Sequence, residues 1–228
     1  MTNKTNWLIA LMMTANSTFA GEILYESTFA ENKWQSDMWQ EYKSWRWQKC
    51  CGWLQRGDHI ENATPTDATQ EEMQGKRAGD AYSTLFLKKP LPTDKLTVTG
   101  EMEFDYRMAP GLIFTIGTPQ KISDSRMELR EHLEIILFDE GINVWHHYFV
   151  DGKQKYKLAG FLRVPFAPKT RYRITAEFDK YSYGQMLTVK VGEYRFGCVL
   201  PELPDTVQAG IVGCEGINRF YDFVAVSR

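Results

Sequence analysis

Alternation of apolar and polar residues with a period of two constrains the fold of this chain more than any other feature. In LTVTGEMEFDY (96–106) apolar side chains alternate with threonines and carboxylates, and RYRITAEFD (171–179) alternates in the same way. Successive side chains of a strand point to opposite faces of a sheet, so both segments predict half-buried strands. Further β-type runs are GLIFTIG, HLEIILF, MLTVKV and RFYDFVAV. No window longer than about ten residues has a convincing helical period.

Turn signals separate these runs. VDGK (150–153) is typical of a tight hairpin, and KPLPTD and PELPD are loops interrupted by proline. Residues 64–83 predict a long surface loop with one helical turn at DATQEEMQ. The final run, GIVG followed by RFYDFVAV, predicts a closing hairpin. Many short strands at near-regular spacing favour an all-β fold, a single β-sandwich jelly roll of two antiparallel sheets.

Residues 1–20 have the pattern of a secretory signal peptide. Lys4 precedes the apolar run 7–13, and small residues follow up to Ala20. This run is far below the ~20 residues that a membrane span needs, and no later stretch is long and apolar enough. We expect cleavage after Ala20, a secreted or periplasmic location, and one domain over residues 21–228.

The net charge and the cysteine spacing bear on which partners, metal sites and disulfides we expect. The formal net charge of −2 predicts neither a nucleic-acid partner nor a polybasic membrane anchor. The cysteines, Cys50, Cys51, Cys198 and Cys214, lack a zinc-type spacing. Cys198 and Cys214 lie in neighbouring predicted strands and could pair. Three pairings are open, and Cys50 and Cys51 could equally be buried thiols.

A tryptophan-rich segment, WQEYKSWRWQKCCGW (39–53), predicts a surface that binds sugars. Period two places Trp45 and Trp47 on one face of a strand, where their rings could stack on the apolar faces of a sugar. The alternative is that these tryptophans close one edge of the sandwich core, as buried aromatic residues commonly do.

Residues 126–153 hold the strongest candidate site. In a strand over 132–138, His132 and Glu134 share a face, and the next strand presents Asn143, Trp145 and His147 together. The two strands are joined by DEG, so they are predicted hairpin neighbours. All five side chains are therefore expected to converge on one sheet face.

The residue types in this group suggest acid–base chemistry on a bound sugar. A carboxylate raises the pKa of a nearby histidine and fixes its tautomer, and a tyrosine can exchange a proton with a sugar oxygen. The candidate catalytic residues are His132, Glu134, His147 and Tyr148. The candidate substrate-binding residues are Trp45, Trp47, Asn143, Trp145 and Arg219. The alternative is a solvent-facing polar strand, with Arg219 only supporting a turn.

Four segments of the chain together resemble the concanavalin A-like lectin and glucanase superfamily. They are the start GEILYESTF, the strands LTVTGEMEFDY and PGLIFTIG, and the ending GIVGCEGINRFYDFVAV. More narrowly, GLIFTIG followed by GINVWHHYF is similar to a bacterial family of unknown function (domain of unknown function 1961), whose members often occur with pectin- or alginate-degrading enzymes. Asn143, Tyr148 and Phe149 match that family, and its histidine could be His146 or His147. The arginines that follow in the family are replaced here by Val150, Asp151 and Gly152.

The resemblance implies a jelly roll with a polysaccharide in the groove of its concave sheet. One hypothesis is binding with cleavage by a hydrolase or lyase, although the clustered carboxylates of laminarinase-type enzymes are absent from the sequence. The alternatives are a non-catalytic carbohydrate-binding module and a structural envelope domain. No metal ligands and no cofactor are assigned. Structural calcium, held by loop oxygens, is compatible with such folds, although no loop motif demands it.

Overall fold

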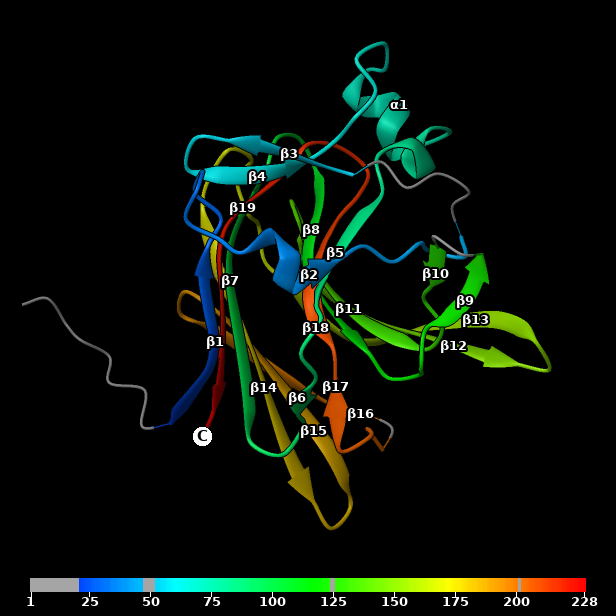
Figure 1. Ribbon diagram of the computed structural model, residues 1–228, viewed down its shortest axis with the longest axis vertical. Helices are drawn as coiled ribbons and strands as arrows, with labels where there is room; N and C mark the ends of the chain where they lie inside the picture. The colour runs from blue at the N-terminus through cyan, green and yellow to red at the C-terminus, as the bar shows by residue number, and fades with distance from the viewer. Residues whose placement is uncertain (1–20, 47–51, 124–125, 201) are drawn as a thin grey trace, which may run out of the picture.

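The computed structural model describes residues 21–46, 52–123, 126–200 and 202–228, which form two antiparallel sheets (Figure 1). Within these residues the first sheet has eight strands in the order β16-β15-β14-β7-β19-β4-β3, and β1 also pairs with β19. Its strands are β1 (Glu22–Thr28), β3 (Trp53–Arg56), β4 (His59–Asn62), β7 (Leu96–Phe104), β14 (Tyr172–Tyr181), β15 (Gly184–Val191), β16 (Tyr194–Leu200) and β19 (Asn218–Ser227).

The second sheet has seven strands among the described residues, in the order β13-β12-β11-β8-β18-β5-β2. These strands are β2 (Trp39–Gln40), β5 (Ser83–Leu87), β8 (Met108–Thr115), β11 (His132–Phe138), β12 (Gly141–Val150), β13 (Lys153–Arg163) and β18 (Ala209–Gly213). Two short pairs are β6 (Leu91–Pro92) with β17 (Thr206–Val207) and β9 (Gln120–Ser123) with β10 (Arg126–Glu128). The helical turns are η1 (Ser36–Met38), α1 (Gln70–Gln74) and η2 (Ala78–Asp80).

The main hydrophobic core lies between the two sheets. The seven-stranded sheet contributes residues such as Phe114 and Ile135, and the eight-stranded sheet contributes residues such as Phe178 and Phe223. All four are fully buried, and burial of each such side chain contributes about 1.5–3 kcal/mol. The predicted all-β sandwich is confirmed.

A second, smaller hydrophobic cluster lies on the outer face of the seven-stranded sheet. It joins Phe86, Ile113 and Ile136 on strands to Tyr42 and Tyr82 in the segments that precede β3 and β5. These two segments therefore cover part of the outer face of the sheet, and a pocket opens beside the cluster.

Several local predictions are confirmed. Asp151 and Gly152 have φ of 51° and 72°, and Val150 pairs with Lys153, which is the geometry of a two-residue hairpin turn. In the loop 64–83, helix α1 occupies part of the predicted helical turn. The Thr69 side chain caps α1, and the Glu72 side chain completes the capping box.

The predicted closing hairpin is wrong. β18 pairs with β8 and β5 in the seven-stranded sheet, whereas β19 pairs with β7, β1 and β4 in the other sheet. Both strands bury apolar side chains in the same core from opposite sides, so their apolar patterns could not tell which sheet each strand joins.

The suggested pairing of Cys198 with Cys214 is also wrong, because both are free thiols. Cys198 lies on β16 in the eight-stranded sheet, and burial raises its pKa to about 11. Cys214 follows β18 in the opposite sheet. The predictions on residues 1–20, Cys50 and Cys51 fall outside the described residues. In the described part of the chain, no helix is long and apolar enough to cross a membrane.

Candidate functional site

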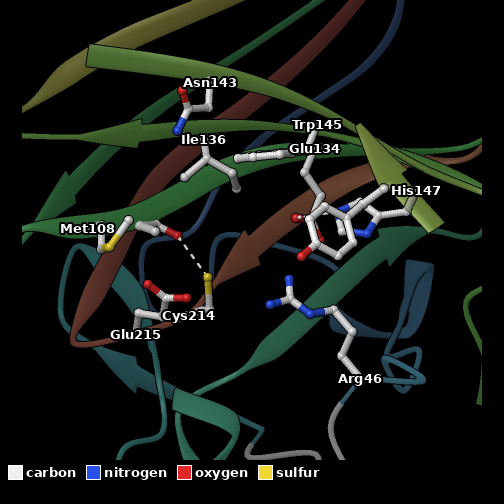
Figure 2. Close-up of a pocket in the computed structure, with 11 residues that line it drawn as sticks. Arg46, Met108, Glu134, Ile136, Asn143, Trp145, His147, Cys214 and Glu215 are labelled. Carbon is white, nitrogen blue, oxygen red and sulfur yellow. Dashed lines mark hydrogen bonds and ion pairs between the residues drawn. The ribbon is translucent and has the colours of Figure 1, made fainter. Parts of the chain in front are cut away.

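A pocket of about 210 Å³ lies on the outer face of the seven-stranded sheet (Figure 2). Its apolar and aromatic lining comes from Met108, Ala109, Ile136, Trp145 and Tyr156. Its polar lining comes from Arg46, Glu134, Asn143, His147, Cys214 and Glu215. Aromatic rings and ionisable groups thus meet in one concave site, which is the usual composition of a ligand pocket.

The β11–β12 hairpin brings the predicted residues together. His132 pairs with His147, Glu134 with Trp145, and Ile136 with Asn143. The predicted convergence of the five side chains on one sheet face is therefore confirmed, while their roles remain predictions. Glu134 and His147 line the pocket and His132 lies beside them, each at most 5% exposed.

The two histidines flank the Glu134 carboxylate. Their rings stack in parallel with centroids 4.5 Å apart. His132 Nε2 lies 3.4 Å from Glu134 Oε1, and His147 Nε2 lies 3.3 Å from Glu134 Oε2. His132 Nδ1 donates to the Arg130 carbonyl at 2.7 Å. That bond places the Nδ1 proton, since a carbonyl oxygen can only accept.

Tyr82 completes the surroundings of Glu134. Its hydroxyl donates to Glu134 Oε1 at 3.0 Å. Burial raises the pKa of the Glu134 carboxyl, but His147 and His132 more than offset this effect, and the pKa lies well below its usual range. Burial, and then the charge of Glu134, raise the pKa of Tyr82 well above its ordinary value. The pair is therefore a carboxylate and a protonated phenol.

Glu215 is a second carboxyl group in the pocket, which the sequence analysis placed only in a turn. Burial raises the pKa of Glu215, Arg46 lowers it, and Glu134 raises it, with a net increase. Figure 2 shows Glu215 and Arg46 across the pocket from Ile136 and Asn143. The pocket therefore contains one carboxylate held ionised and a second carboxyl group that holds its proton more tightly.

Two buried asparagines hold the loop that carries Glu215. Asn62 Nδ2 donates to the carbonyls of Ala81 and Gly216 at 2.6 and 2.9 Å, and Asn62 Oδ1 accepts from the Asn218 backbone N–H at 2.8 Å. Asn218 Nδ2 donates to the carbonyls of Cys214 and Gly216. No periodic pattern marks these residues, so sequence reasoning missed their role.

Tyr148 does not lie in the pocket. It follows His147 on β12, so its side chain points to the other face of the sheet, where its ring contacts His146 at 5.1 Å. His146 Nε2 bonds Glu131 Oε1 at 2.7 Å and takes no part in the pocket either. The predicted grouping of Tyr148 with His132, Glu134 and His147 is therefore wrong, and of the two adjacent histidines it is His147 that faces the site.

The predicted sugar-binding residue Trp45 is not among the residues that line the pocket, although its neighbour Arg46 is. Trp45 lies in a turn rather than a strand, half-buried, with its ring 6.4 Å from that of Phe149. Trp47 lies outside the described residues. Trp39 is buried and Trp53 packs against the main core, as the alternative interpretation expected.

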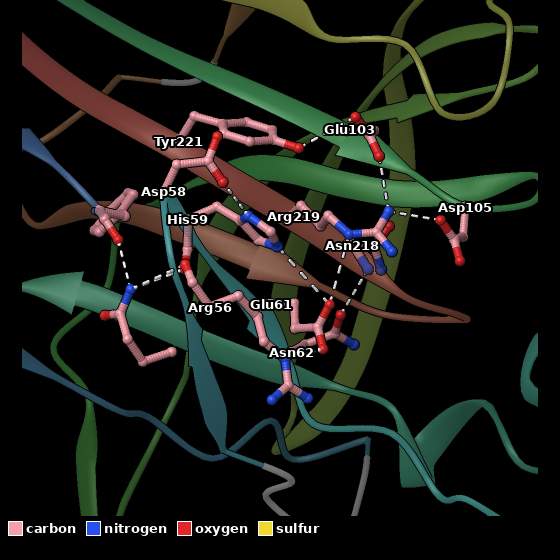
Figure 3. Close-up of polar contacts among 12 residues, drawn as sticks. Arg56, Asp58, His59, Glu61, Asn62, Glu103, Asp105, Asn218, Arg219 and Tyr221 are labelled. Atoms are coloured by element: carbon pink, nitrogen blue, oxygen red, sulfur yellow. Dashed lines mark hydrogen bonds and ion pairs between the residues drawn. The ribbon is translucent and has the colours of Figure 1, made fainter. Parts of the chain in front are cut away.

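Arg219 belongs to the other sheet, so its assignment to the same site is corrected. Figure 3 shows it on β19 among carboxylates. Its Nη1 lies 2.7 Å from Glu103 Oε1 and 2.5 Å from Asp105 Oδ1, and its Nε lies 3.5 Å from Glu61 Oε2. Alternation along β19 turns it away from the core, toward solvent on the eight-stranded sheet.

Comparison with solved structures identifies the architecture. The Emp47p carbohydrate recognition domain matches with a TM-score of 0.57 and 11% identity, covering 90% of this chain and 97% of that one. The fold is that of the concanavalin A-like lectins. The carbohydrate-binding module CBM66 from Bacillus subtilis matches with a TM-score of 0.52 and 9% identity, covering 83% of this chain and 96% of that chain.

A protein of unknown function with a galectin-like fold, also from Bacillus subtilis, matches with a TM-score of 0.53 and 13% identity over 91% of this chain and 96% of that chain. The sequence matches no family model and no curated protein. At these identities the likeness shows the fold alone, and the predicted concanavalin A-like jelly roll is confirmed at that level. The narrower resemblance to the bacterial family remains a prediction.

Proposed function

We propose that this protein binds a polysaccharide or oligosaccharide in the pocket on the outer face of its seven-stranded sheet, in a secreted or periplasmic setting. The observation that carries the proposal is that aromatic rings and polar side chains line the same pocket. Trp145 and Tyr156 pack edge to face with centroids 5.9 Å apart, and Tyr156 is 63% exposed. Asn143, Arg46 and Glu215 line the same pocket.

The chemistry of this lining suits sugars. A pyranose presents apolar C–H faces to aromatic rings and hydroxyls to amides, carboxylates and guanidinium groups. Solved structures of the same fold are described as a carbohydrate-binding module and a carbohydrate recognition domain. These similarities support the proposal without specifying the sugar.

A glycan array with the wild-type protein tests binding, followed by titration of the best glycan against two variants. Tyr156→Ala is expected to weaken binding about tenfold or more, a loss of about 1.4 kcal/mol. Tyr183→Ala is the matched control, because Tyr183 is similarly exposed, at 66%, but belongs to the β14–β15 turn of the other sheet. Equal affinity of both variants would contradict the proposal.

Cleavage is a second candidate function, and a specific observation favours it. The pocket holds Glu134, ionised between two histidines, and Glu215, whose pKa is raised by burial. Groups with opposite proton affinities in one site are a common arrangement for acid–base catalysis. The chemistry would be that of a hydrolase or a lyase, with Tyr156 as the tyrosine that lines the site.

Assays for new reducing ends and for unsaturated products, run on each glycan that binds, separate the two functions. Product formation that is lost in Glu215→Gln would support cleavage. Tight binding with no product from any bound glycan would leave a carbohydrate-binding module. Failure to bind any glycan would favour the structural envelope domain instead.

A further inference from the structure

His132, Glu134 and His147 form a buried group of three potential metal ligands, whereas acid–base catalysis needs only two such groups. These three buried side chains each offer one ligand atom, and the three atoms lie within 4.8 Å of one another. Two of them come from one strand at positions i and i+2, and the third comes from the paired strand directly opposite His132. The backbone register therefore fixes all three on one face of a rigid sheet.

The unpartnered Nε2 of His147 is the first indication that the centre of this group could hold an ion. Its side chain is 2% exposed, yet neither Nδ1 nor Nε2 has a hydrogen-bond partner among the described residues. A buried polar atom without a partner costs about 1–3 kcal/mol. Nε2 points at the Glu134 carboxylate but lies 3.3 Å away without hydrogen-bond geometry.

His132 leads to the same conclusion from its tautomer. Its Nδ1 proton goes to the Arg130 carbonyl, so the Nε2 of a neutral ring presents a lone pair to Glu134 Oε1. Two lone pairs 3.4 Å apart repel unless a proton or a cation lies between them. Charging both rings would put two parallel imidazolium groups 4.5 Å apart in a buried site.

The distances suit a metal ion. Two ligands that each lie about 2.0–2.1 Å from a tetrahedral zinc ion are about 3.4 Å apart. Each histidine Nε2 lies at about that separation from one oxygen of the Glu134 carboxylate, 3.4 Å from His132 to Oε1 and 3.3 Å from His147 to Oε2. The outer contacts of two of the three residues also fit, because metal-bound histidines donate their second N–H to a carbonyl, as His132 does, and ligand carboxylates accept hydrogen bonds, as Glu134 does from Tyr82.

We propose that His132, Glu134 and His147 bind a divalent transition-metal ion of the zinc type. Two imidazoles and one carboxylate are the donors that such ions prefer, whereas calcium selects oxygen ligands. Three protein ligands leave a coordination position free, and Glu134 and His147 line the pocket, so this position faces the pocket. Trp145 and Tyr156 stand beside it.

This proposal does not depend on sugar binding. Once an ion is bound, the three residues act as ligands, and Glu215 and Tyr156 are the groups that remain for proton transfer in the pocket. A ligand oxygen, from water or from a sugar, would complete the coordination.

The test measures zinc in the untagged full chain after chelator treatment and reconstitution. We expect about one zinc per chain by elemental analysis, and a visible absorption spectrum of imidazole–carboxylate type when cobalt replaces zinc. His147→Asn is expected to abolish both signals. His146→Asn is the matched control, since His146 is the adjacent residue, equally buried, and points to the other sheet face; it should bind zinc like the wild type.

Tyr82→Phe keeps the proposal testable if His147→Asn fails to fold. This change removes one hydroxyl from the Glu134 contact and keeps all three ligands, and we expect zinc affinity to fall roughly 10–100-fold. A wild-type chain that folds but binds neither zinc nor cobalt would overturn the proposal, as would binding that is unchanged in both His147→Asn and Tyr82→Phe. Glycan binding by a metal-free chain would leave the proposed function standing while the metal site fails.

Discussion

At the scale of single residues, the environment rather than the residue type decides what each ionisable group does. Glu134 and Glu215 line the same pocket, but two histidines hold the first ionised, while burial favours the protonated form of the second. Arg219, of a type common in sugar sites, is instead occupied by three carboxylates on the other sheet. Each assignment requires the neighbours to be known.

Glu215→Gln is expected to stabilise the protein at neutral pH. Because the pKa of Glu215 is raised by folding, the folded state binds more protons than the unfolded state, and stability falls as pH rises above the ordinary value of 4.5. The glutamine variant lacks this loss. Thermal unfolding should show a higher Tm for the variant at pH 7 and no difference below about pH 4, where both states are protonated. A lower Tm at pH 7 would contradict the assignment.

Arg219→Met is expected to cost about 1–3 kcal/mol of stability, because it leaves Glu61, Glu103 and Asp105 as neighbouring negative charges. Denaturant unfolding measures the loss. Glycan affinity should stay at the wild-type value, since Arg219 lies on the sheet opposite the pocket. A large loss of affinity in a folded variant would restore Arg219 as a binding residue.

At the scale of elements, the pocket depends on the register of the β11–β12 hairpin and on the hydrogen bonds that hold the loop between β18 and β19. The β11–β12 pairing places His132 opposite His147, and a shift of one residue would turn these side chains to the other face. The turn Asp139-Glu140 between the strands is short, which restricts the register. The far side of the pocket is set by the loop between β18 and β19, which Asn62 ties to β4.

Asn62→Ala is expected to loosen that loop and to cost about 2 kcal/mol or more, because the variant removes three hydrogen bonds, to the carbonyls of Ala81 and Gly216 and from the Asn218 N–H. Cys214 reports the change. Its thiol is half-buried and donates to the Ala109 carbonyl, so its reaction with a thiol reagent, followed by mass spectrometry, should be faster in the variant. Cys198, on the other sheet, is the internal control and should react at an unchanged rate.

At the scale of the whole molecule, ion pairs of Asp179 connect segments of the eight-stranded sheet that are far apart in sequence. Asp179 on β14 binds Lys95, which precedes β7, at 3.0 Å, and Arg228, at the chain end, at 3.1 Å. Burial raises the pKa of Asp179, but Lys95 and Arg228 lower the pKa by a larger amount, so its net shift is downward. The group therefore links three segments far apart in sequence.

Asp179→Asn is expected to lower stability at pH 7 by about 1 kcal/mol or less. A carboxyl whose pKa is lowered by folding stabilises the protein above its unfolded pKa, and this contribution disappears as pH falls through the folded value. The deficit of the variant should therefore be full at pH 7 and should shrink below the ordinary value of 3.8. Asp205→Asn, at a site 98% exposed, is the control with little effect at either pH.

The sequence by itself determined most of the long strands, the tight turn at Asp151-Gly152 and the convergence of His132, Glu134, Asn143, Trp145 and His147. All of these are local, because alternation within a strand and a short connection between two strands suffice to place the side chains. The fold class followed from the repetition of the same pattern.

Only the tertiary structure decided what lies opposite this hairpin. Arg46, Tyr82, Cys214 and Glu215 reach the pocket from segments distant in sequence, and Asn62 holds one of them in place. The same is true of the two sheets to which β18 and β19 belong, and of the placement of Arg219 outside the pocket. Alternation reports which face of a strand is buried, but it carries no information on which segments come together across the fold, because those contacts depend on how the sheets pack.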